Sequence, residues 1–256
     1  MDKDIKVMIV PDVHGRDFWR EPVLSNLNKE IIFLGDYLDP YPREGITRER
    51  AIEVFKEIVE LRKKHNNITL LLGNHDCSYP FKTSICECRH DWGNHSEIAK
   101  VFNENFDMFD IAKEKVINKK HFFFCHAGVH KSWIKANSFI FPKGFNPSAK
   151  NFNKLLHQAE NKPFDGFSNA LDCISYHRGG YDGFGSIVWA DLREFLDNDN
   201  IKKSKKIFVV GHTMLNGVAV RVSNNLYCID CQKVFYIDSN GVLRYYDDDE
   251  EITISI

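Results

Sequence analysis

Five short, largely apolar runs recur along the chain, and each leads into a turn that carries Asp, Asn or His. The runs are 5–10, 31–34, 68–72, 122–125 and 207–210. Runs of this length that end at turn-forming residues are typical of strands buried on both faces of a parallel sheet. Ligands bind outside the carboxyl ends of the strands in open α/β sheets. We therefore expect the polar residues that follow the runs to face one cleft.

Helical spacing is clearest over 48–63, where Thr47 is a suitable N-cap and the apolar residues form one stripe. A helix over 16–27 is also predicted, although Pro22 interrupts its pattern. Strand, helix and strand in succession indicate a right-handed crossover and a parallel sheet. The remaining helical patterns cover 96–109, 149–160 and 168–177.

The C-terminal part has the alternation of an all-antiparallel segment. Its apolar stretches are 218–222, 226–229, 234–237 and 242–246, with turn residues at 224–225 and 239–241. This order predicts an antiparallel meander. The acidic run at 247–251 is expected to be solvated.

Residues 131–180 are the least regular part and are rich in phenylalanine. We expect a single domain over 1–256 in which this segment is an insertion that packs over one side of the sheet and forms a wall of the cleft. The alternative is that its phenylalanines only seal the core, which is the commoner fate of aromatic residues at helical spacing.

Composition narrows the class of protein. With 256 residues, 43% hydrophobic and 27% charged, the chain has the profile of an ordinary globular protein with a full core. A net charge of −2 indicates no broad nucleic-acid or anionic-membrane footprint. No apolar run approaches the roughly 18 residues of a membrane span, and no signal-peptide pattern precedes the first motif. We expect a cytoplasmic protein without a membrane partner.

The seven cysteines raise the question of a zinc site. Cys86 and Cys88 form one close pair, and Cys228 and Cys231 form another, but the pairs are far apart and differently spaced. A structural zinc site needs four suitable ligands. We therefore expect reduced thiols, with Cys125 filling space in the core.

The polar residues after the five runs form an ordered set of motifs. These are D-x-H (Asp12, His14), G-D-x-x-D (Asp36, Asp39), G-N-H-D (Asn74, His75), H-A-G (His126) and G-H-T (His212). So many charged and polar groups in one place are costly to desolvate unless they bind a metal ion. Mixed nitrogen and oxygen donors suit Mn, Fe or Zn better than Ca.

Two metal ions about 3.5 to 4 Å apart need a bridging carboxylate, and they can hold a bridging hydroxide near neutral pH. Asp36 is the natural bridge, and the hydroxide is expected to attack phosphorus in line. His75 is then placed to protonate the leaving alkoxide, and Asp39 to orient and charge its imidazole.

These motifs, together with 187–189 and 227–230, resemble the calcineurin-like metallophosphoesterases. Within that family they resemble the phosphoprotein phosphatase branch, including its phage-type bacterial members; Met214 points the same way, since many other members have G-H-x-H there. The resemblance implies a four-layer α/β/β/α sandwich of two mixed sheets flanked by helices, and a phosphorylated substrate. It also implies two divalent ions, Mn before Fe or Zn. One would be held by Asp12, His14 and Asp36, the other by Asp36, Asn74, His126 and His212, with His75 and Asp39 as the acid pair.

The chain departs from this family at the phosphate-gripping arginines. The three positions at which the phage-type phosphatases carry arginine hold Pro40, Leu72 and Asp191. Replacements are expected among nearby arginines: Arg193 first, then Arg43, with Arg89 and Arg178 as further candidates.

Three functions remain open from the sequence. The leading one is hydrolysis of phosphate monoesters, on a phosphoprotein or a small phosphorylated molecule. A second is hydrolysis of nucleotides such as dinucleoside polyphosphates, or of phosphodiesters. A third, a non-catalytic metal-binding module, would be expected to have lost ligands or the acid, and this chain retains all of them.

Overall fold

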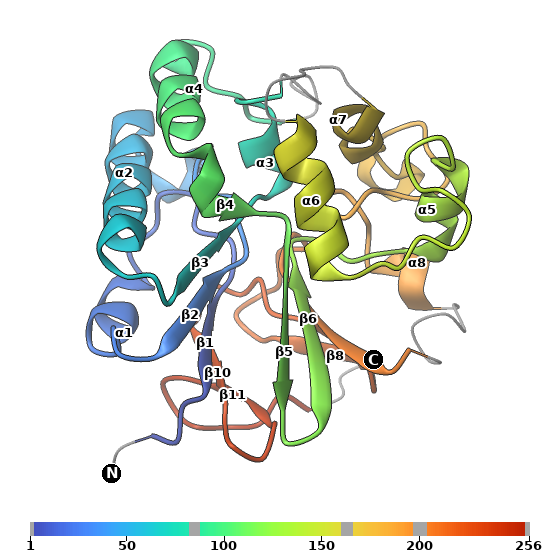
Figure 1. Cartoon of the computed structure of the whole chain (residues 1–256). Coiled ribbons are helices and arrows are strands. Elements are labelled where there is room, and N and C mark those ends of the chain that lie inside the picture. The colour runs from blue at the N-terminus through green and yellow to red at the C-terminus, as the bar shows by residue number, and fades with distance from the viewer. Residues whose placement is uncertain (1–2, 82–87, 160–165, 197–203, 254–256) are drawn as a thin grey trace.

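Two mixed β-sheets lie face to face between helices in the computed structural model, which describes residues 3–81, 88–159, 166–196 and 204–253 (Figure 1). The first sheet has the order β11-β10-β1-β2-β3-β4 and the second the order β5-β6-β7-β9-β8. The strands of the first sheet are β1 (Val7–Val10), β2 (Glu30–Phe33), β3 (Ile68–Leu71), β4 (Phe109–Asp110), β10 (Phe235–Ile237) and β11 (Leu243–Tyr245). The predicted four-layer sandwich is confirmed.

Strand direction decides where the motifs meet. β1, β2 and β3 are parallel neighbours, with Ile9 opposite Ile32 and Ile31 opposite Ile68. In the second sheet β6 and β7 are also parallel, with Phe123 opposite Phe208. Parallel strands bring their carboxyl ends to one edge of a sheet, so the motif-bearing turns of each sheet are gathered at one edge.

The second sheet contains a strand that the apolar runs do not indicate. Its strands are β5 (Ala112–Ile117), β6 (Lys120–Cys125), β7 (Lys206–Val210), β8 (Val220–Ser223) and β9 (Leu226–Cys228). β5 pairs antiparallel with β6 at the edge of the sheet and carries three charged residues in a row. An edge strand tolerates such charges, which is why its sequence lacks the apolar signature.

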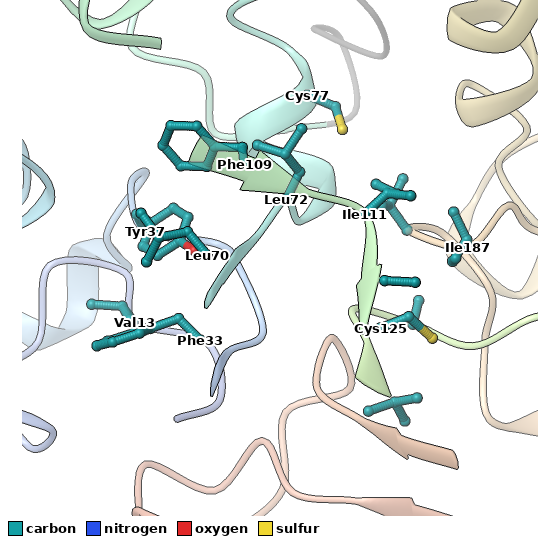
Figure 2. Close-up of a cluster of buried hydrophobic side chains, with 14 of the residues drawn as sticks. Val13, Phe33, Tyr37, Leu70, Leu72, Cys77, Phe109, Ile111, Cys125 and Ile187 are labelled. Carbon is teal, nitrogen blue, oxygen red and sulfur yellow. The ribbon is translucent and has the colours of Figure 1, made fainter. Parts of the chain in front are cut away.

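Side chains of the central strands alternate between two cores. In β1, Val7 and Ile9 face the layer between the sheets, while Met8 and Val10 face the helices. This two-sided burial explains the continuous apolar runs. Figure 2 shows part of the larger core, in which Tyr37 lies next to Phe33 and Phe109, with ring centroids 6.4 and 6.1 Å apart.

Helices cover the outer faces of the sandwich (Figure 1). The predicted helix over 48–63 is confirmed as α2 (Arg48–Lys64), and the Thr47 side chain accepts a 3.1 Å hydrogen bond from the amide of Arg50. The other helices of four residues or more are α1 (Arg20–Leu24), α3 (Asn74–Cys77), α4 (His95–Glu104), α5 (Lys131–Ala136), α6 (Ala149–Ala159), α7 (Gly166–Leu171) and α8 (Arg193–Leu196). Short 3-10 turns occupy Pro42–Glu44, Phe106–Met108 and Tyr176–Arg178.

The predicted C-terminal meander is wrong. β8 and β9 form an antiparallel hairpin in the second sheet, whereas β10 and β11 form one in the first sheet. The chain changes sheet between them because β9 pairs with β7 and β10 pairs with β1. Such long-range pairing has no trace in local periodicity. The helix predicted over 16–27 is also shorter than expected, since only 20–24 are helical.

Among the described residues of 131–180, several phenylalanines lie in the core, while Phe164 lies outside the described residues. Phe141, Phe152 and Phe167 are buried in the larger cluster, while Phe139 is 73% exposed. The six cysteines among the described residues are free thiols, and Cys125 is fully buried; Cys86 lies outside the described residues. In the described part of the chain, none of the helices has the length and apolar character that crossing a bilayer requires.

Candidate active site

The turns after five strands bring the predicted motif residues into one buried cluster. Asp12 and His14 follow β1, Asp36 and Asp39 follow β2, and Asn74 and His75 begin α3 after β3. His126 follows β6 and His212 follows β7. Of these eight residues seven are buried, and His212 is partly buried.

Asp36 lies at the centre of the cluster. Its Oδ2 is 3.5 Å from Nε2 of His14 and 3.4 Å from Nε2 of His126. Its Oδ1 accepts a 3.0 Å hydrogen bond from the amide of His75. Burial alone would raise the pKa of Asp36, but the neighbouring His126 and His75 hold it well below the usual value. Asp36 is therefore an ionised carboxylate that histidines from both sheets approach.

Two of these histidines are oriented by main-chain carbonyls. Nδ1 of His14 donates to the carbonyl of Leu38 at 2.7 Å, and Nδ1 of His126 donates to the carbonyl of Leu34 at 3.0 Å. In a neutral imidazole this leaves the Nε2 lone pair pointing at the Asp36 carboxylate. Two lone pairs aimed at an anion are repelled by it, so the arrangement calls for positive charge there, either a proton on Nε2 or a metal ion between the groups. Metal-ligating histidines are oriented by their second nitrogen in this manner, so the donor set fits a metal ion.

Asn74 joins the remaining histidines. Its Oδ1 lies 2.9 Å from Nε2 of His126 and 2.9 Å from Nδ1 of His212, and these two ring nitrogens are 3.2 Å apart. Burial would lower the pKa of His126, yet the charges of Asp36 and Asp12 raise it to about 10. The position thus favours positive charge, which a proton or a metal ion can supply.

Ligand atoms converge in two groups. Within each group the atoms lie within 4.8 Å of one another: His14, Asp36 and His75 in one, and Asp36, His126 and His212 in the other. Asp36 belongs to both, as a bridging carboxylate must. The first group contains His75 where the sequence predicts Asp12. Both oxygens of Asp12 accept from the amide of His212 at 3.1 Å.

Glycine provides the space for the carboxylates. A Cβ on Gly73 would lie 2.1 Å from Oδ1 of Asp36, and a Cβ on Gly211 would lie 2.0 Å from Oδ1 of Asp12. Both glycines precede a predicted ligand in their motifs. The G of G-N-H-D and the G of G-H-T are therefore required by close approach to an anion.

Several site residues have left-handed backbone conformations. His14, Asp36, Asp39 and His212 have φ between 47° and 63°. Such conformations cost about 1–3 kcal/mol each and persist where the surroundings enforce them, commonly at functional sites. One enforcing group is Asp76, whose buried carboxylate accepts from the amides of Asp36, Tyr37 and Gly73 at 2.6–3.1 Å.

Asp76 is a site residue that the sequence prediction missed. Burial and the charge of Asp36 raise its pKa to about 7, against the effect of its backbone hydrogen bonds. The available signal was its place as the fourth letter of G-N-H-D. Asp230, in the 227–230 motif, is a second one: burial and then the charge of Asp12 raise its pKa well above the usual value.

The predicted acid pair is in contact. Nδ1 of His75 lies 2.8 Å from Oδ2 of Asp39. Burial opposes charge on His75, but the Asp36 charge and the bond to Asp39 outweigh it and raise the pKa of the imidazole. The other carboxylate oxygen of Asp39 accepts from the hydroxyl of Tyr79 at 2.6 Å.

The arginines near the motifs differ in the residues that they contact. Arg193, the first predicted for the phosphate, is bound to Asp191 through Nε at 2.7 Å and to the carbonyl of His177 at 2.6 Å. Nη2 of Arg43 lies 2.8 Å from the sulfur of Met214.

Arg178 and Arg89 contact a neighbour or a member of the cluster. Arg178 donates to the hydroxyl of Thr213, next to His212, and its charge helps to lower the pKa of His212 after the larger effect of burial. Arg89 stacks 3.6 Å from the ring centre of Tyr41 and donates to the carbonyl of Asp39 at 2.9 and 3.1 Å. Arg89 is thus bonded to Asp39, a member of the cluster, and Arg178 to Thr213, the neighbour of His212.

Comparison with known proteins gives a family and a fold. A model of the calcineurin-like phosphoesterase family matches residues 5–235. No significant match was found among curated proteins.

Solved structures with a similar fold include a cold-active protein-tyrosine phosphatase of a psychrophilic Shewanella species. It is 15% identical over 97% of this chain and 80% of its own, with a TM-score of 0.62. A second structure of a cold-active protein tyrosine phosphatase, determined at 1.1 Å resolution, is also 15% identical and has the same coverage, with a TM-score of 0.52.

Proposed function

This chain belongs to the calcineurin-like phosphoesterase family, and on that basis we propose that it hydrolyses phosphate monoesters with two divalent metal ions. The observation that carries the proposal is the convergence of histidines from both sheets on the ionised Asp36. We assign the substrate to phosphoproteins or small phosphorylated molecules. The Shewanella protein of similar fold is a protein-tyrosine phosphatase, and phosphotyrosine is itself a phosphate monoester.

The residues that would hold the ions are the predicted ones. Asp12, His14 and Asp36 would hold one, and Asp36, Asn74, His126 and His212 the other. Bound divalent ions supply Lewis acidity toward phosphoryl oxygens and lower the pKa of water. Manganese is our first choice, with iron or zinc next, because the donors mix imidazole nitrogen with carboxylate and amide oxygen.

His75 is the residue that would transfer a proton to the leaving group. Its bond to Asp39 fixes the hydrogen on Nδ1 and directs the ring, so Nε2 is the nitrogen that remains for the substrate. The raised pKa favours the protonated imidazole, which suits a general acid. Such an acid typically contributes about 10² to 10⁴ in rate.

Arg89 and Arg178 are the first candidates for binding the phosphate group. Each is partly exposed, and each is anchored to a residue beside a candidate ligand or the acid pair. Arg43 is a candidate at the rim, since it also lies over the ring of Tyr41, at 5.5 Å. Arg178 and Arg193 both pair with Asp191, through Nε at 2.8 and 2.7 Å. Arg193 is the weaker candidate because its other contact is the carbonyl of His177, whereas Arg178 reaches Thr213 beside His212.

Phosphate release from p-nitrophenyl phosphate tests the proposal. Chelator-stripped protein should be inactive, and Mn, Fe, Zn or Mg should be added back separately. We expect Mn or Fe to restore activity, and Asp36→Asn to abolish the restored activity. Asp107→Asn, the same substitution at an exposed aspartate, is the matched control and should behave as the wild type.

Two outcomes would contradict the proposal. Activity that is insensitive to chelators would remove the metal ions from the mechanism. Binding of two ions without release of phosphate from any monoester would shift the assignment to a diester or polyphosphate substrate.

A further inference from the structure

Tyr79 connects the predicted acid pair to His90 and Asp91. It is 1% exposed, and its ring stacks on His90 with centroids 4.4 Å apart and planes at 26°. Phe102 of α4 lies nearly parallel to the same ring, with centroids 6.1 Å apart. These contacts from two elements fix the position of the phenol, so its hydroxyl has a defined direction.

The hydrogen-bond pattern determines where the phenolic hydrogen lies. The amide of Asp91 donates to the Tyr79 oxygen at 3.1 Å, and an amide can only donate. The hydroxyl must therefore give its own hydrogen to Oδ1 of Asp39, 2.6 Å away. Oδ2 of Asp39 accepts from Nδ1 of His75 at 2.8 Å. The Asp39 carboxylate is thus held through both oxygens.

The main chain of Asp39 is held as well. Its φ of 57° is unfavourable for a residue with a side chain. Arg89 donates Nε and Nη2 to the Asp39 carbonyl at 3.1 and 2.9 Å. Arg89 and Asp91 belong to the same short segment, so one stretch of chain orients both the backbone and, through Tyr79, the carboxylate of Asp39.

We propose that Tyr79 is a positioning residue for leaving-group protonation, acting through Asp39 on His75. This inference rests on the proposed function, because it assigns His75 the proton that the leaving group receives. The hydroxyl stops the Asp39 carboxylate from rotating, and the carboxylate in turn keeps His75 aligned. Loss of the hydroxyl should therefore impair only substrates whose leaving group needs that proton.

The test compares Tyr79→Phe with the wild type on two substrates. β-Glycerophosphate releases a basic alkoxide, whereas p-nitrophenyl phosphate releases a stable phenolate. We expect kcat on β-glycerophosphate to fall about 10-fold with little change in KM, the size seen for partners that orient catalytic groups. On p-nitrophenyl phosphate kcat should stay within about 2-fold, since the acid contributes less there.

Tyr236→Phe is the matched control, because its hydroxyl also donates to a carboxylate, that of Asp249 at 2.9 Å, outside the site. It should leave the ratio of the two kcat values unchanged. Equal kcat values for Tyr79→Phe and wild type on both substrates would overturn the assignment of Tyr79 while leaving the proposed function intact. An equal loss on both substrates would also overturn it, because that is the effect of a merely structural residue.

A second measurement covers the case in which the proposed function fails. The Nδ1 hydrogen of His75, bonded to Asp39, should give a downfield proton NMR resonance that disappears in His75→Gln. In Tyr79→Phe we expect this resonance to shift or to broaden through faster exchange with water. Inactivity of the wild type on every monoester would refute the proposed function alone; an unmoved resonance would refute the role of Tyr79.

If Tyr79→Phe does not fold, Asp91→Pro provides the second variant. Proline has no amide hydrogen, so it removes the donor that directs the hydroxyl hydrogen toward Asp39. It also removes the Asp91 carboxylate, which binds Arg48 at 2.9 Å and Asn94 at 2.8 Å, so Asp91→Ala is its control. We expect a change in the same substrate ratio in Asp91→Pro but not in Asp91→Ala. The same ratio in both folded variants, together with an unmoved His75 resonance, would overturn the proposal.

Discussion

Oδ2 of Asp36 lies 3.4 Å from Nε2 of His126, although these residues follow strands of different sheets. The contact joins the two sheets at the edge where their parallel strands end. His14 approaches the same oxygen from the first sheet. A cation at this point binds both halves of the sandwich, so ligand binding and folding stability should be coupled.

Metal ions should accordingly stabilise the folded protein. A ligand present at 100 times its Kd adds about 2.7 kcal/mol per site when it binds only the folded state. For a chain of this size that corresponds to roughly 5–10 °C in Tm per site. Thermal unfolding of chelator-stripped protein, followed by circular dichroism with and without Mn²⁺, measures the shift.

Asp36→Asn is the informative variant for this prediction. It keeps the shape of the side chain but removes the charge shared by both groups of ligands. We expect the Mn²⁺-dependent rise in Tm to disappear, whereas Asp107→Asn should retain it. A full shift in Asp36→Asn would show that the stabilising ions bind elsewhere.

Gly73→Ala should inactivate the protein by steric overlap alone. Gly73 has φ −96°, which any residue can adopt, so backbone strain does not contribute. The added methyl group would lie 2.1 Å from Oδ1 and 2.6 Å from the amide of Asp36. Overpacking of this kind costs about 1–3 kcal/mol or more, and here it displaces a candidate bridging ligand. Phosphate release and the denaturation midpoint in urea measure the two effects.

Gly183→Ala is the control, since its Cβ would meet nothing within 4 Å and its φ is not positive. It should leave both measurements unchanged within error. Wild-type activity in Gly73→Ala would mean that Asp36 can move aside without cost.

The arginines give a prediction about substrate binding. Arg178→Gln and Arg89→Gln should each lower kcat/KM for phosphate monoesters by about 10- to 100-fold, the range of one charged hydrogen bond. Arg193→Gln should lower it by less than about 3-fold, because beyond Asp191, which Arg178 also binds, its guanidinium group contacts the carbonyl of His177 and not a neighbour of a candidate ligand. Steady-state kinetics on p-nitrophenyl phosphate would decide between them, and the reverse ranking would restore Arg193 as the phosphate-binding residue.

The strand-end grouping could be predicted from the residues because it depends on local signals, whereas the two-sheet sandwich was implied only by the resemblance to the phosphoesterase family. A four-residue apolar run followed by Gly-Asp or Gly-His defines a buried strand and its exit turn. Pairing between distant segments leaves no such signal, which is why β10 was assigned to a meander rather than to the neighbour position of β1. β5 was missed because an edge strand needs no apolar run.

The same reasoning explains the site. Asp36 and Gly73 stand in recognisable motifs, so their grouping could be predicted. Tyr79 and Arg89 lie on either side of residues 82–87, which are outside the described residues, and each is placed by tertiary contacts, with Asp39 and Tyr41 respectively. Their sequence neighbourhood carries no motif, and only the folded chain reveals that they surround the acid pair.

His130 should make stability depend on pH outside the metal cluster. Its Nδ1 accepts the amide hydrogen of Ser132 at the start of α5, and its ring stacks on Phe184 at 4.1 Å. Burial lowers its pKa to about 4. The unfolded chain, with a pKa near 6.5, binds this proton more readily, so stability is complete above pH 6.5 and declines as the pH falls toward 4. The decline attributable to His130 should be on the order of 2 kcal/mol.

His130→Asn keeps an oxygen that can cap α5 but does not titrate, so the difference in the free energy of unfolding between wild type and variant isolates this contribution. Urea unfolding of both proteins at pH 7.5, 6, 5 and 4.5 should show curves that approach each other as the pH falls. Curves that stay parallel would mean that His130 takes up its proton equally well in the folded and unfolded chain.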